Sequence, residues 1–67
     1  MRADDEVLAL LREYARSPLT ARDIFQILGP DGLTMASILS SLLFLKESGD
    51  IVSVETASRI LAWKPAP

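Results

Sequence analysis

The segment from residue 34 to residue 48 is more apolar than a helix with one buried side needs to be. It reads TMASILSSLLFLKES, and six of the eight positions from 38 to 45 are Ile, Leu or Phe. With about 3.6 residues in each helical turn, Ile38, Leu42 and Leu45 fall on one stripe, which is wide enough to face a core. We therefore expect a helix over residues 34–48, with this stripe turned inward.

The remaining apolar residues of the same segment do not fit that stripe. Leu43 and Phe44 fall on other sides of the helix, and Leu39 lies at the edge of the stripe. The pattern predicts that at least Phe44 faces solvent in an isolated chain. The positions expected to point outward are Ala36, Ser40, Leu43, Phe44 and Glu47.

Two shorter helices are expected before this segment. Residues 5–16 begin with acidic side chains and end with Arg12 and Arg16, which suits the helix dipole, and the Ser-Pro pair at 17–18 stops the helix. Leu19 is then a single extended residue. Residues 20–28 form the second helix, with Thr20 as N-cap and Asp23 completing a weaker form of the capping box. Gly29 is expected to end it as a C′ glycine that is followed by a proline.

After Gly49, which ends the long helix that Thr34 caps, the apolar period changes. Residues 51–54 are mostly β-branched and read as a strand, and residues 59–64 read as a second strand that ends at Pro65. The polar residues 55–58 connect the two strands as a hairpin. The sequence therefore predicts an α+β fold in which residues 1–67 form one domain of three helices and a two-stranded hairpin.

Composition excludes several classes of function. The 67 residues contain no Cys and no His, and the net charge is -2. The commonest general base and metal ligand is therefore absent, and no catalytic arrangement or phosphate-binding glycine loop is recognisable. We expect no enzyme activity, no cofactor and no metal. No signal peptide is evident at the start and no apolar run approaches the ~18 residues of a membrane span, so a cytoplasmic protein without a membrane partner is expected.

The order of elements resembles the winged-helix superfamily, a winged form of the helix-turn-helix. A closer likeness is to the Z-nucleic-acid-binding domains of RNA-editing adenosine deaminases and related innate-immune proteins. It is carried by EVLALL at 6–11, by TARD at 20–23 with the LG at 28–29, and by the WK at 63–64. The family has a pair of prolines before the wing tryptophan, where this chain has leucine and alanine.

The third helix departs further from that family. The resemblance implies an asparagine where this chain has Leu39 and a tyrosine where it has Leu43, and lysines where it has Met35 and Ala36. The likeness therefore supports the fold and argues against that family's nucleic-acid binding. The C-terminal winged helix of the replication protein A middle subunit is similarly patterned, and that domain binds proteins.

Two sets of candidate site residues follow. The first is an apolar patch for a protein partner, because contiguous exposed apolar surface marks interfaces; it comprises Phe25, Leu39, Leu43 and Phe44. The alternative for these residues is packing under the wing or the N-terminus, which we favour for Leu39. The second set would contact nucleic acid and comprises Ser37, Ser40, Lys46, Arg59, Trp63 and Lys64. The alternative there is that Trp63 covers the core and that the charges are solvated surface.

These observations favour a non-enzymatic winged-helix module that acts through protein–protein contacts, by self-association or as an adaptor, in a nucleic-acid-related process. The alternative is a DNA-binding transcription regulator whose dimer gathers Arg59 and Lys64 on paired wings. DNA binding by a monomer is expected to be weak, because the outward side of the third helix lacks Arg, Lys, Asn and Gln. A third possibility is a purely structural subunit of a larger assembly. Its sequence would show the same pattern as that of the protein-binding module.

Overall fold

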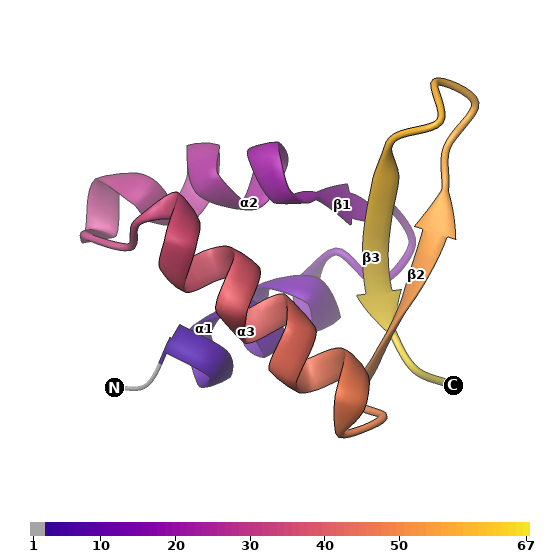
Figure 1. The fold of residues 1–67 in the computed structure, drawn as a ribbon, viewed down its shortest axis with the longest axis horizontal. Coiled ribbons are helices and arrows are strands. Elements are labelled where there is room, and N and C mark those ends of the chain that lie inside the picture. The colour runs from indigo at the N-terminus through magenta and orange to yellow at the C-terminus, as the bar shows by residue number, and fades with distance from the viewer. Residues whose placement is uncertain (1–2) are drawn as a thin grey trace.

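The computed structural model describes residues 3–67 as three α-helices gathered beside a small antiparallel sheet (Figure 1). The chain runs in the order α1 (Ala3–Glu13), β1 (Leu19–Thr20), α2 (Ala21–Leu28), the 3-10 helix η1 (Gly29–Asp31), α3 (Met35–Glu47), β2 (Ile51–Glu55) and β3 (Leu61–Pro65). Figure 1 shows α3 crossing in front of α1, with α2 above it and the sheet at one side. The predicted three helices followed by a hairpin are confirmed.

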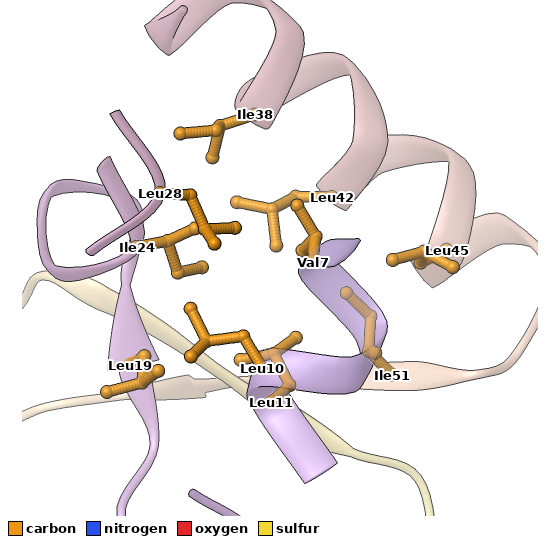
Figure 2. Packing of buried hydrophobic residues seen from close by; sticks show 10 residues of the cluster. All are labelled: Val7, Leu10, Leu11, Leu19, Ile24, Leu28, Ile38, Leu42, Leu45 and Ile51. Atoms are coloured by element: carbon orange, nitrogen blue, oxygen red, sulfur yellow. The ribbon is translucent and has the colours of Figure 1, made fainter. Parts of the chain in front are cut away.

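The core is built where α3 meets the other two helices. Its side chains come from all three α-helices and from two strands, and Figure 2 shows them converging: Val7, Leu10, Leu11, Leu19, Ile24, Leu28, Ile38, Leu42, Leu45 and Ile51. The expected stripe of Ile38, Leu42 and Leu45 is buried, as predicted. Burial of each such side chain contributes roughly 1.5–3 kcal/mol, so these contacts dominate the stability of so short a chain.

The sheet has three strands, not two, in the order β1-β3-β2. The segment that sequence reasoning treated as one extended residue is the short strand β1, in which Leu19 pairs with Trp63. The same Trp63 pairs with Ser53 on its other side. Because β3 pairs with β1, and β1 leads directly into α2, the backbone of β1 joins the wing to the helical body.

The capping box at the start of α2 is confirmed. The Thr20 hydroxyl oxygen accepts a hydrogen bond from the Asp23 N–H at 3.1 Å, and the Asp23 carboxylate accepts one from the Thr20 N–H at 3.1 Å. At α3, the Thr34 hydroxyl oxygen accepts a hydrogen bond from the Ser37 N–H at 3.1 Å. These caps satisfy amide groups that have no partner inside the helix.

The first helix ends earlier than expected. The α1 helix stops at Glu13, and the chain continues as a turn in which the Ser17 N–H donates to the Tyr14 carbonyl at 2.9 Å. Tyr14 is exposed, so no burial stabilises a further helical turn, and Pro18 disfavours helical geometry at the residue before it. The predicted helix over residues 5–16 is therefore displaced toward the N-terminus.

Gly29 ends α2, as predicted, but without the left-handed conformation that is usual for a C′ glycine. Gly29 keeps a right-handed helical conformation with a φ of -57°, and the chain tightens into η1, where Pro30 is tolerated near a helix start. Gly32 takes the left-handed conformation instead, with a φ of 102°. Gly49 follows α3 with a φ of 83°, which agrees with its predicted role in ending that helix.

The second wing strand begins two residues later than predicted. Residues 56–60 form the connection, which is closed by a hydrogen bond of 2.9 Å from the Arg59 N–H to the Thr56 carbonyl. Arg59 has a φ of 61°, a left-handed conformation that breaks the extended backbone. The strand β3 therefore starts at Leu61 and includes Pro65, and β2 extends to Glu55.

Removing the α2 cap should lower the stability of the fold measurably. We expect Thr20→Ala to reduce the free energy of unfolding by about 1 kcal/mol, because the Asp23 amide loses its acceptor. In a domain of this size that corresponds to a fall in Tm of roughly 4–8 °C. Ser58→Ala in the exposed wing loop is the control, with an expected change within about 0.5 kcal/mol. Equal melting temperatures for the two variants in a circular dichroism melt would contradict the role of the capping box.

Candidate partner-binding surface on the third helix

The α3 helix has one buried side and one apolar exposed side. Leu43 is 59% exposed, Leu39 is 51% exposed and Phe44 is 50% exposed. The predicted exposure of Phe44 is confirmed. The favoured interpretation of Leu39 as a packed residue is wrong, since half of its surface faces solvent.

These three residues lie around the outward direction of α3. Leu39 and Leu43 are four residues apart, which places them one turn apart on nearly the same side of the helix. Phe44 lies on the other flank, so Leu43 and Phe44 project to either side of the direction that points away from the buried stripe. We call Leu39, Leu43 and Phe44 the α3 patch. The other expected outward positions, Ala36, Ser40 and Glu47, are exposed as well.

The α3 patch is nearly uncharged. Within α3 the charged side chains are Lys46 and Glu47, which are adjacent and opposite in sign. Ser41, which could have offered a hydroxyl to a ligand, is 3% exposed and belongs to the buried side. The chemistry available on the outward side is therefore mainly apolar contact, with the Ser40 hydroxyl and the Glu47 carboxylate beside it.

Phe25 was predicted to join this surface from the second helix. It lies on α2, is 40% exposed, and packs its ring against Gly29 of the same helix end. A Cβ atom on Gly29 would lie 3.2 Å from the Phe25 ring, so the glycine leaves room for the aromatic side chain. The contribution of Phe25 to a partner surface stays a prediction.

The wing carries a second apolar pair that sequence reasoning did not single out. Ile60 is 55% exposed and Leu61 is 50% exposed, at the junction of the loop with β3. Figure 1 shows this end of the hairpin projecting beyond the helices. The signal in the sequence was the unbroken run Ile60-Leu61-Ala62-Trp63, since a strand that alternates between two faces must expose part of such a run.

Two residues of the predicted nucleic-acid set are brought together. The Lys46 Nζ atom lies 5.9 Å from the centroid of the Trp63 ring, within the range of a cation–π contact. Trp63 also packs against the core and is partly buried, which agrees with the interpretation that it covers the core. This contact ties the end of α3 to the central strand of the sheet.

The other residues of that set are more dispersed. The Ser37 hydroxyl is occupied by the α3 cap, where it accepts a hydrogen bond of 3.0 Å from the Thr34 hydroxyl. Ser40 is exposed on α3, Arg59 is exposed in the wing loop, and Lys64 is exposed on β3. Trp63 and Lys64 are consecutive in a strand, so their side chains point to opposite faces of the sheet.

Comparison with solved structures bears on the fold. The apo Zalpha domain of zebrafish PKZ is similar to this chain, with a TM-score of 0.72 and 21% sequence identity over 97% of this chain and 98% of that one. The chain folds as a winged helix. No protein-family model and no curated protein sequence matches it.

In this winged helix, α3 occupies the place of the recognition helix of the helix-turn-helix class. Such a helix reads bases through Arg, Lys, Asn or Gln, whose donor and acceptor groups match base edges. The exposed α3 positions in this chain carry Leu, Phe, Ala, Ser, Glu and one Lys, which is Lys46 beside the Trp63 ring. The α3 patch itself carries none of these base-reading side chains, and its apolar groups suit an apolar partner.

Two further structural findings concern the described part of the chain. Among residues 3–67, no three His, Cys, Asp or Glu side chains gather in a way that could hold a metal ion. None of the helices in that range is long and apolar enough to cross a bilayer.

The two sides of α3 should respond differently to the same substitution. Leu42→Ser should cost at least about 2–5 kcal/mol, because it leaves a cavity and a hydroxyl in the core, and should unfold a domain this small. Phe44→Ser should cost about 1 kcal/mol or less, since half of the ring already faces solvent. Urea denaturation of both variants measures the difference. Unfolding of Phe44→Ser as severe as that of Leu42→Ser would mean that the ring is part of the core.

Proposed function

We propose that this winged helix is a non-enzymatic protein-binding module, and that the α3 patch binds a second copy of the chain. The observation that carries the proposal is the exposure of Leu39, Leu43 and Phe44 on the one helix that the fold presents for recognition. Each side chain forgoes part of the roughly 1.5–3 kcal/mol that full burial would contribute. A partner that covers the α3 patch recovers that free energy, less the entropy of association.

A second copy suits the chemistry of this surface. In a two-fold symmetric dimer the same patch occurs on both subunits, so it must be complementary to itself. The α3 patch meets that condition because its side chains are apolar and because Lys46 and Glu47 are opposite in charge. No excess of one charge on α3 opposes the approach of an identical helix. A pair of half-exposed leucines and a phenylalanine is a small contact, so we expect a dissociation constant roughly in the micromolar range or weaker.

The proposed setting is a nucleic-acid-related process in the cytoplasm. The winged-helix fold supports it, because that fold includes the Z-nucleic-acid-binding domains that the sequence resembles. The module would then bring copies of the chain together in such a process, through a helix whose outward positions are largely apolar. An adaptor would use the same α3 patch, but it would bind a different protein there instead of a second copy of the chain.

A charge placed within the α3 patch should weaken self-association strongly. Sedimentation equilibrium of the wild-type chain from about 10 μM to about 1 mM should show a monomer–dimer equilibrium, and Leu43→Glu should weaken it at least about tenfold, because a carboxylate would be desolvated. Gln26→Glu adds the same charge to the exposed surface of α2 and should leave the equilibrium unchanged. A wild-type chain that stays monomeric over this whole range of concentration would contradict the proposed dimer.

A DNA-binding regulator is the second candidate, and the Lys46–Trp63 contact is the observation that favours it. An aromatic ring with a cation at the junction of α3 and the wing can contact nucleic-acid backbone or bases. In a dimer, Arg59 and Lys64 of two wings would add four positive charges.

We expect duplex DNA to bind weakly. Fluorescence anisotropy at physiological salt should give a dissociation constant above about 0.1 μM, outside the range of specific regulators. A tighter, salt-sensitive constant would favour the regulator over the protein-binding module. Loss of that binding in Ser40→Ala would then place the contact on α3, and its loss in Lys64→Gln would place it on the wing.

A further inference from the structure

A groove runs between the first and second helices, away from the α3 patch. The α1 and α2 helices both pack on α3, and an open groove of about 500 Å³ remains between them. Figure 1 shows the start of α1 and the end of α2 at the same end of the molecule, where these two helices run in opposite directions. The groove is lined by five residues of α1 and two of α2, namely Asp5, Glu6, Ala9, Leu10, Glu13, Ile27 and Leu28.

The floor of the groove is apolar. Ala9 and Leu10 of α1 face Ile27 and Leu28 of α2 across it. Leu10 and Leu28 are buried members of the core, whereas Ile27 is 39% exposed and has apolar surface left to cover. An apolar floor of this kind accepts the side chains of one face of an amphipathic helix.

The rim of the groove is acidic. Asp5, Glu6 and Glu13 line it, and the lining contains no Lys or Arg. Among residues 3–67, no hydrogen bond or ion pair joins the side chain of Asp5, Glu6 or Glu13 to another residue. Asp5 and Glu13 are about 12 Å apart along the axis of α1, at 1.5 Å per residue. Charges at both ends of the groove thus match the length of about two turns of a bound helix.

From this combination we propose that the α1–α2 groove binds a basic amphipathic helix of a partner protein. Leucine-like side chains of that helix lie on Ala9 and Ile27, and its Lys or Arg side chains pair with Glu6, Glu13 and Asp5. The net charge of -2 on the whole chain assists the approach of a basic segment. The groove and the α3 patch share no residue, so this site stands independently of the self-association proposed above.

The test uses a synthetic amphipathic peptide of about 15 residues, long enough to form a helix on binding, with leucines on one face and Lys and Arg beside them. The control peptide has every Lys and Arg replaced by Glu. The basic peptide is titrated into the isotope-labelled full chain, and amide chemical shifts are followed by NMR. Shifts confined to α1 and α2, which weaken as salt is raised, are the expected result.

Two matched charge reversals locate the site. Glu13→Lys should weaken the basic peptide about tenfold, because a favourable charge pair becomes repulsive. A lysine near the C-terminal end of α1 suits the helix dipole, so the variant should fold. Glu47→Lys makes the same change on α3 and should leave the affinity unchanged, as should Leu43→Glu, which disrupts only the α3 patch.

Three results would contradict the proposal that the α1–α2 groove binds a basic helix. They are shifts centred on α3 or the wing, equal binding of the acidic peptide, and no shifts with the basic peptide at a concentration of about 1 mM, where even weak complexes form. A monomeric wild-type chain whose α1 and α2 amides still respond to the basic peptide would refute the dimer and support the groove. A dimer without that response would do the reverse.

Discussion

The rest of the structure depends on the packing of one stripe of α3 against α1 and α2. Ile38, Leu42 and Leu45 are almost completely removed from solvent, and they contact side chains from both other helices (Figure 2). A chain of 67 residues can build only one core, and this contact supplies its centre. Because α1 and α2 both pack against α3, they make few direct contacts with each other.

That arrangement explains why two surfaces remain open. A helix can turn only about a third to a half of its circumference toward a core, so the extra apolar residues of α3 are left in water. The two helices that share α3 enclose a groove, and the acidic residues that begin α1 lie along its rim. Acidic side chains at a helix start are favoured by the dipole, and here the same residues give the groove its charge.

The two surfaces differ in kind. The α3 patch is apolar and close to neutral, which suits contact with its own copy, whereas the α1–α2 groove combines an apolar floor with a carboxylate rim. The wing is held to this body from two directions. The pairing of β1 with β3 fixes its base, and the contact between Lys46 and Trp63 joins it to the end of α3. The fold thus presents two separate surfaces on one small domain.

Local chemistry in the sequence was sufficient for most of the fold. The caps at Thr20 and Thr34, the buried stripe of α3, and the change of period after Gly49 act over a few residues, so they could be read without a structure. The differences from the predictions concern the ends of helices. At Gly29 the backbone stays helical, and the chain continues through Pro30 into a 3-10 turn. The end of α1 was misplaced because nothing buries Tyr14 to hold another turn.

Only the tertiary structure decided which residues meet across long separations. The exposure of Phe44 followed from helical periodicity, but that of Leu39 did not, because a residue at the edge of a stripe is covered or left open according to what packs beside it. The pairing of Leu19 with Trp63, and the groove between residues near 5–13 and 27–28, join segments that have no local signal of their contact. Sequence determines which side of each helix is apolar. The directions in which the helices cross α3 determine which of that apolar surface is buried and which is left for a partner.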